Sequence, residues 1–176
     1  MDSKSVKLRK EGNAIYKSFL ENIDACLVIK ETKLLNCLKI YNESVNSAYT
    51  RHELSSALKN LSIVSYHLFL INNQKLDKKL TIYYAFEVQL NYKKAIDNAT
   101  GKNISEYSQS NEWINQINQK QIEAAESYLN IFIKPYVIDD DEKISLLVNL
   151  RDKSPDLIKC LVDYQISELC HRVTDT

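Results

Sequence analysis

Apolar side chains recur every three or four residues along most of this chain, the spacing that places them on one face of an α-helix. Near the start, Leu8, Ile15 and Phe19 form such a stripe, and Tyr16 lies beside it. The pattern continues in later segments, which predicts helices at about residues 3–20, 31–49, 51–70, 76–96 and 104–133. Residues 21–29 either extend the first helix or break it near Asn22.

Turn-forming residues mark the boundaries between these helices. The pair Asn72–Asn73 predicts a turn, and the cluster Asp97–Asn103 predicts the clearest break in the chain. Asn103 and Glu106 have the spacing of a capping box, which starts a helix. A long polar helix is therefore expected to begin just after this cluster.

The C-terminal third has its own signals. Pro135 predicts the end of the long polar helix, because proline lacks a backbone donor and restricts the residue before it. The acidic run Asp139–Glu142 suits the positive end of a helix, and we prefer helix stabilisation to a cation site there. Ser154, Pro155 and Asp156 supply a cap, a proline at the first helical position and an acidic first turn. Two further helices are therefore expected.

The composition strengthens the helical prediction. The 176 residues include only two glycines and two prolines, so a sheet joined by Gly/Pro turns is not expected. A hydrophobic fraction of 44% in a chain of this length supports one domain with a sizeable core. We expect an all-α fold of six or seven helices. Residues 1–97 form its first part, and residues 104–176 form helices that pack on that part as one folded unit.

One of the two glycines, Gly12, lies inside the first predicted helix. Glycine in a helix interior costs about 1 kcal/mol relative to alanine. The simplest reason for its presence is that a second helix packs against the bare backbone at this point. Gly12 therefore predicts a closely packed helix pair.

Charge and targeting signals narrow the function. The chain has 23 basic and 23 acidic residues, and a net charge of zero argues against binding to nucleic acid or to a membrane surface. The longest apolar run, Ile63–Ile71, is far shorter than the roughly 20 residues that span a bilayer. The first twenty residues lack the hydrophobic segment of a secretory signal. We expect an intracellular, cytoplasmic protein.

Signatures of catalysis and metal binding are scarce. Phosphate-binding loops need several glycines, and His52, His67 and His171 do not have the spacing of metal ligands. The four cysteines match no zinc or redox pattern and are expected to be reduced thiols in the core. We expect no enzyme activity, no metal and no cofactor.

The most informative polar residues are Arg9 and Asn13, which are four residues apart and share one helix face. The segment around them, residues 7–17, resembles the first helix of a tetratricopeptide repeat. The residues that carry this resemblance are Leu8, Gly12, Asn13 and Tyr16. Residues 34–48 resemble the second helix of that repeat, and residues 56–68 resemble the first helix of the next one.

The resemblance implies a way of binding peptides. Co-chaperones of this family hold terminal carboxylates with a basic residue and an asparagine on one helix, and an asparagine on the next repeat's first helix. Arg9, Asn13 and Asn60 match these three positions. The family's second pair of basic residues is not matched, because the helix expected from residue 104 has Glu106 there. An acidic chaperone-type peptide is therefore expected to bind weakly or not at all.

The spacing also departs from the family. Asn13 and Asn60 are 47 residues apart, whereas the repeat is about 34 residues long, which implies an insertion around residues 21–31. Stacked helix pairs form a concave face lined by the first helix of each pair. The candidate peptide-binding residues are Arg9, Asn13, Tyr16, Lys17, Ser56, Asn60 and Tyr83.

We therefore expect a non-catalytic interaction module that binds a peptide or protein partner on this face, as a scaffold or adaptor does. Its C-terminal helices would cap the last apolar surface. The alternative is a structural helical bundle that mediates self-association or the assembly of a larger complex.

Overall fold

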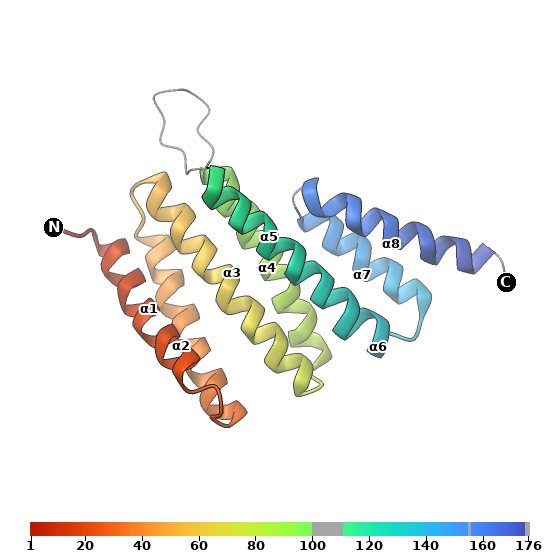
Figure 1. Cartoon of the computed structure of the whole chain (residues 1–176), viewed down its shortest axis with the longest axis horizontal. Coiled ribbons are helices and arrows are strands. Elements are labelled where there is room, and N and C mark those ends of the chain that lie inside the picture. The colour runs from red at the N-terminus through yellow and green to blue at the C-terminus, as the bar shows by residue number, and fades with distance from the viewer. Residues whose placement is uncertain (100–110, 155, 175–176) are drawn as a thin grey trace.

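The computed structural model describes residues 1–99, 111–154 and 156–174, and every regular element in these ranges is a helix (Figure 1). The elements are α1 (Lys4–Glu21), α2 (Leu27–Asn46), α3 (Arg51–Gln74), α4 (Lys78–Ala99), α5 (Asn111–Ser127), η1 (Tyr128–Ile133), α6 (Lys134–Tyr136), α7 (Asp140–Lys153) and α8 (Asp156–Thr174). Because α5, η1 and α6 follow one another without a gap, they form one long helix. The prediction of an all-α fold with six or seven helices is confirmed.

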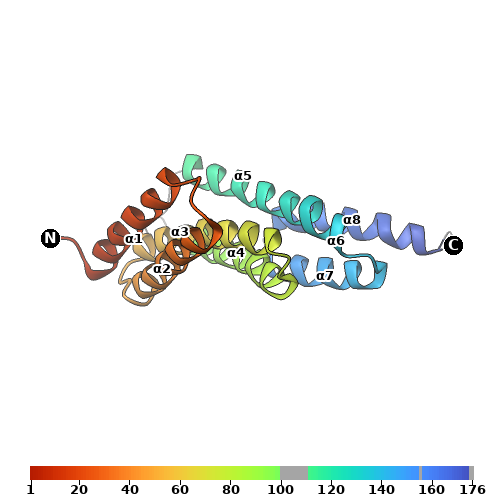
Figure 2. The ribbon, with the colours of Figure 1, turned by 90° about the horizontal axis from the view of Figure 1, so that it is seen from below.

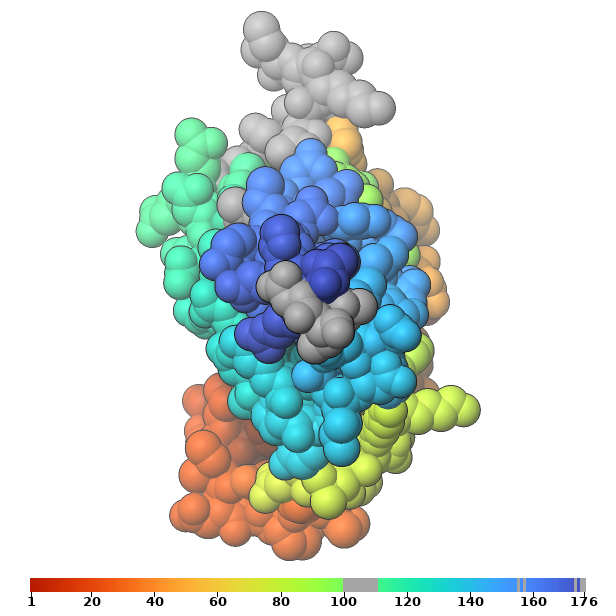
Figure 3. Space-filling view, turned by 90° about the vertical axis from the view of Figure 1, so that its right-hand side faces the viewer, coloured from red at the N-terminus to blue at the C-terminus, as the bar shows by residue number. Residues whose placement is uncertain are grey.

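The helices lie in two layers with an end cover. Figure 2 shows α1 and α5 raised above α3, with α2 and α4 on the other side. At the far end of the molecule, Figure 3 shows the blue helices α7 and α8 covering the surface. One cluster of buried apolar side chains runs through both parts of the chain, from Phe19 in α1 to Leu169 in α8. The two predicted parts therefore share a core.

Side-chain caps explain where several helices begin. The hydroxyl of Ser3 accepts a hydrogen bond from the Val6 backbone, and that of Thr50 accepts one from Glu53. At the start of α7, the carboxylate of Asp139 accepts from the backbone of Asp141 and Glu142. These bonds satisfy donors that the first turn leaves free. The acidic run therefore acts as a helix start, as the sequence predicts.

Gly12 lies where the sequence predicts a close helix contact. Gly12 is buried, and the ring of Tyr41 in α2 covers it. A Cβ atom placed on Gly12 would lie 2.5 Å from Cε1 of Tyr41, closer than real Cβ atoms approach other atoms. The prediction that a second helix packs against Gly12 is confirmed.

Some boundaries differ from the sequence prediction. The chain breaks after Glu21, and α2 begins at Leu27, earlier than the expected residue 31. The turn expected at Asn72–Asn73 is wrong, because α3 continues to Gln74. Asn72 is buried there and donates its side-chain amide to the carbonyl of Leu68, so it serves the helix interior.

The actual turn between α3 and α4 contains Leu76 in a left-handed conformation, with φ at 60°. The backbone N–H of Asp77 donates to the carbonyl of Asn72, the bond that closes a Schellman turn. Glycine usually occupies this position because a Cβ atom is crowded there. A leucine at this position gives no turn signal in the sequence.

The long helix passes through Pro135 instead of ending before it. The six residues Tyr128–Ile133 form a π-helix, and the N–H of Lys134 donates to the carbonyl of Leu129. Proline crowds the carbonyl four residues before it, and a wider turn relieves such crowding. The predicted end at Ile133 is therefore wrong by one short turn, because the helix ends at Tyr136.

Two further predictions concern boundaries near the middle of the chain. Asp97 and Asn98 belong to α4, which ends at Ala99, so the expected break does not begin at residue 97. The proposed capping pair Asn103 and Glu106 lies outside the described residues.

Among the described helices, α3 alone has the length and hydropathy of a membrane span, and 61% of its most apolar window is buried inside the protein.

Candidate functional site

The surface formed by α1, α3 and α5 brings most of the predicted site residues together, and we call it the α1–α3–α5 face. Figure 2 shows α3 lying between and below the other two helices. A hollow of about 200 Å³ lies on this face. It is lined by Tyr16 from α1, by Tyr66 and His67 from α3, and by Lys120 and Glu123 from α5, among other residues. Three helices far apart in the sequence therefore build one site.

Asn13 and Asn60 are in direct contact at the end of this face. The side-chain amide of Asn60 donates to Oδ1 of Asn13 at 3.1 Å. The hydroxyl of Tyr41 donates to the same oxygen at 2.6 Å. An amide oxygen has two acceptor positions, so both are filled, while the N–H groups of Asn13 stay available to a ligand.

The contact with Tyr41 explains why Gly12 and Asn13 are neighbours in the sequence. Because Gly12 has no side chain, the Tyr41 ring reaches the α1 backbone, and its hydroxyl then reaches Asn13. Asn13 thus has a structural role through its oxygen. Its amide donors and those of Asn60 point to a second role, because both residues keep access to solvent.

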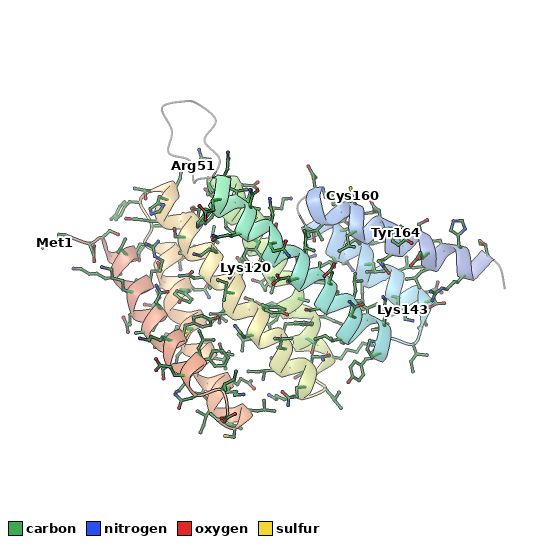
Figure 4. The ribbon with its side chains drawn as sticks, viewed as in Figure 1. Met1, Arg51, Lys120, Lys143, Cys160 and Tyr164 are labelled. Carbon is green, nitrogen blue, oxygen red and sulfur yellow. The ribbon has the colours of Figure 1, made fainter. Side chains whose placement is uncertain are left out.

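Arg9 lies one helical turn before Asn13, Lys59 directly precedes Asn60, and the charges of Lys120 and Arg9 both act on Lys59. Arg9 is partly buried, and its Nη1 atom is fully buried without a hydrogen-bond partner in the described structure. Burial, followed by the nearby charges of Lys120 and Arg9, lowers the pKa of the Lys59 ammonium. Lys120 on α5 is exposed and is labelled in Figure 4. Within the described residues, none of the three forms an ion pair with a carboxylate.

The nearest carboxylates are occupied elsewhere or lie at the rim. Glu53 accepts a hydrogen bond from the backbone of Tyr49, and hydrogen bonds, first from Ser3, lower the pKa of its carboxyl, with Arg9 contributing last. Glu123 borders the hollow and accepts from Gln119 at 3.4 Å. The interior of the face is therefore rich in positive charge and hydrogen-bond donors.

Tyr16 and His67 form the middle of the face. The Tyr16 hydroxyl and Nε2 of His67 are 2.9 Å apart, and their rings are 5.6 Å apart between centroids. Burial, and then the charge of Lys120, lowers the pKa of His67. Burial also raises the pKa of Tyr16. Both groups are held neutral around pH 7, and they can offer hydrogen bonds and an aromatic surface to a ligand.

The remaining predicted site residues are less central. Ser56 is buried one helical turn before Asn60. Lys17 is exposed and pairs with Glu21 at 3.8 Å. Tyr83 is half exposed on α4 and borders a different hollow, between α2, α3 and α4. The structure therefore places Tyr83 apart from the others, because the hollow that it lines is built by α2, α3 and α4 and not by α1 or α5.

Sequence reasoning missed Lys59 and Lys120. Lys59 directly precedes Asn60, so the sequence carried a signal for it. Lys120 lies in a stretch of mixed polar residues with no motif, and it joins the site only because α5 lies beside α3 (Figure 1). Within the described residues, no group of three or more His, Cys, Asp or Glu side chains is placed to hold a metal ion.

Comparison of this chain with protein-family models, with curated proteins and with solved structures finds no match. The site is therefore interpreted from its own geometry. That geometry is a donor-rich, positively charged face with an aromatic hollow, which suits the binding of a carboxylate together with an apolar or aromatic side chain.

Proposed function

We propose that this protein is a non-catalytic interaction module that binds a segment of a partner protein on the α1–α3–α5 face, in the manner of a tetratricopeptide repeat. The observation that carries the proposal is a group of three interacting cations, Arg9, Lys59 and Lys120, none of which forms an ion pair with a carboxylate in the described structure. Two of them lie close to Asn13 and Asn60 along their own helices. A carboxylate of the partner would fill this position.

Electrostatics favours such a ligand. Bringing like charges together and removing them from water destabilises the free protein, as the lowered pKa of Lys59 shows. A bound carboxylate would offset both costs and would accept hydrogen bonds from the amides of Asn13 and Asn60. Hydrogen bonds to charged groups contribute about 1.5–3 kcal/mol each. One well-placed carboxylate therefore supplies a large part of a micromolar affinity.

The hollow beside these cations adds specificity. Its tyrosine rings offer apolar contact, and the Tyr16–His67 pair offers a polar edge. We propose that the partner segment places an apolar or aromatic side chain there. Lys120 supplies one cation on the third helix, whereas the family's clamp has two, so an acidic chaperone-type peptide remains a poor ligand in this proposal.

The test is affinity capture of partners from a cell extract on the immobilised chain. We expect the double variant Asn13→Ala, Asn60→Ala to lose capture severalfold or more, and Lys120→Gln to weaken it. The matched control is Asn36→Ala with Asn42→Ala, because these asparagines are exposed on α2, away from the face. Circular dichroism checks that each variant keeps its helices.

Comparison with the α2 control variants shows whether the loss of capture is specific to the α1–α3–α5 face. If the variants on the face and the variants on α2 capture the same proteins equally well, the binding surface lies elsewhere. Lys120→Gln matters most here, since Lys120 is exposed and forms no hydrogen bond or ion pair with another described residue.

A further inference from the structure

Exposed apolar side chains gather at one end of the helices, which we call the lower edge. Six large apolar side chains that are at least half exposed define it: Ile23, Val28, Ile29, Leu76, Tyr136 and Ile138. Figure 3 shows the segments that carry them, in orange, yellow and cyan, at the same lower end of the molecule. Isolated exposed apolar residues are ordinary, but a group of this size marks a contact surface.

Two hollows flank the end of α3 on this edge. The first, of about 310 Å³, has Phe19 and Leu70 in its wall and Ile23 at its rim. The second, of about 220 Å³, is formed by Leu76, Thr81, Phe132 and Tyr136 with their neighbours. Both are lined mainly by apolar side chains, and each is large enough for one or two side chains of a partner.

The conformation of Leu76 is a second, independent observation. Its φ of 60° is unfavourable for a side chain with a Cβ atom, and glycine would avoid the cost. The side chain is 70% exposed, so burial within this chain does not compensate. A strained and exposed leucine beside an apolar hollow is explained if the side chain contacts a partner.

Charge indicates the chemistry of that partner. The charged side chains that line the two hollows are Lys30 and Lys78, and no carboxylate lines either one. Lys78 already pairs with Glu142 at 2.5 Å, while Lys30 forms no ion pair within the described residues. A symmetric contact of this edge with itself in a second copy would supply the same lysine, Lys30, from both sides and no lining carboxylate to pair with it. A segment with apolar and acidic side chains is complementary in both respects.

We propose that the lower edge binds an acidic amphipathic segment of a second protein, with apolar side chains in the two hollows and a carboxylate beside Lys30. This site is separate from the asparagines and cations of the α1–α3–α5 face. The protein therefore has two docking surfaces, one for a carboxylate on that face and one for an apolar and acidic segment at the lower edge.

The probe is a phage-displayed library of random peptides of about 12 residues, enough for three helical turns. The library is selected on the full chain, and the recovered peptides are synthesised with amidated C-termini, which removes their terminal carboxylate. We expect them to combine apolar residues at helical spacing with Asp or Glu. Their affinity is measured by fluorescence polarisation.

Leu76→Gly and Tyr136→Ser are expected to weaken binding about tenfold or more, the loss that follows from one large apolar contact. Leu76→Gly should also raise the midpoint of thermal unfolding, so its loss of binding is not a loss of folding. Leu35→Ser and Tyr164→Ser remove exposed apolar side chains elsewhere and should leave the affinity unchanged. Asn13→Ala with Asn60→Ala should leave it unchanged as well.

Three results would overturn the proposal. They are the recovery of no binding peptide, the recovery of peptides without acidic residues, and binding that Leu76→Gly and Tyr136→Ser do not weaken. Light scattering adds a fourth, because dimerisation that disappears in Leu76→Gly would show that a second copy occupies the edge. A failure here leaves the test of the α1–α3–α5 face unaffected, since that test uses different residues.

Discussion

Helices α1–α4 and helices α5–α8 are held together in different ways. In the first group, polar bonds cross between helices: the buried hydroxyls of Ser5 and Ser44 each donate to the other's backbone carbonyl at 2.8 Å. In the second group, apolar contact dominates, and Tyr128 keeps a buried hydroxyl without a hydrogen-bond partner in the described structure. Buried Tyr41, in the first group, has its hydroxyl bonded to Asn13.

Buried polar bonds and apolar contacts fix the relative position of two helices to different degrees. A buried polar bond is satisfied in only one arrangement, so it defines how far one helix is shifted along the other. Apolar surfaces tolerate several arrangements at similar free energy. The proposed binding residues of the α1–α3–α5 face come mainly from α1 and α3, and α5 adds Lys120.

The largest expected effect is at Gly12. We expect Gly12→Leu to lower the free energy of unfolding by about 1–3 kcal/mol, because a side chain there collides with the buried Tyr41 ring. Denaturant unfolding followed by circular dichroism measures the change. The matched control is Ala14→Gly, an exposed position in the same helix, which should lose only about 1 kcal/mol of helix propensity. A Gly12→Leu variant more stable than the parent would contradict the close packing.

The next prediction compares the two buried tyrosines directly. Tyr41→Phe removes a satisfied hydrogen bond and should cost about 0.5–1.5 kcal/mol. Tyr128→Phe removes a buried hydroxyl that has no hydrogen-bond partner among the described residues, and it should be neutral or stabilising. The same unfolding measurement gives both values. Equal losses in the two variants would mean that the helix groups do not differ in the way described.

A smaller effect is expected at the turn between α3 and α4. Leu76→Gly should raise the free energy of unfolding by about 0.5–1 kcal/mol, because glycine adopts the left-handed conformation without crowding, which outweighs its greater freedom in the unfolded chain. Leu80→Gly is the contrasting variant, since Leu80 has helical conformation in the first turn of α4, and glycine there should destabilise rather than stabilise. A Leu76→Gly variant less stable than the parent would show that the leucine side chain stabilises the turn.

The smallest effect concerns pH and links the two groups of helices. The pKa of His67 lies below its ordinary value of 6.5, because of burial and then Lys120, so the unfolded chain binds a proton more readily than the folded chain. Stability from this group is therefore complete above pH 6.5 and is lost as the pH falls through that value. The free energy of unfolding, measured between pH 7.5 and 5, should decrease.

The same experiment tests the position of α5. His67→Gln should flatten this decrease, and Lys120→Gln should reduce it in part, because it removes a charge that opposes protonation of His67. His52, whose pKa burial also lowers, adds to the slope, and so does Glu53, whose lowered pKa contributes toward pH 5. An unchanged slope in Lys120→Gln would mean that α5 does not lie over His67 as described.

The sequence predicted the helices and the contact at Gly12, because each depends on local periodicity or on a residue type with one strong reason to be there. The meeting of Asn13 with Asn60 was implied by the resemblance to a tetratricopeptide repeat. The sequence did not predict the features that depend on tertiary packing, namely the turn at Leu76 and the position of Lys120. Leu76 occupies a turn position that glycine prefers, so the turn was placed too early. Lys120 has no motif, and only the path of α5 brings it to Lys59.

The central claim is that a partner's carboxylate binds among Arg9, Lys59 and Lys120. The most direct test is calorimetric titration of the captured partner's binding segment against the same segment with its contacting carboxylate changed to an amide. The amide should bind at least about tenfold more weakly to the parent chain, and this difference should shrink in Lys120→Gln. Equal affinity of acid and amide for the parent chain would contradict the claim.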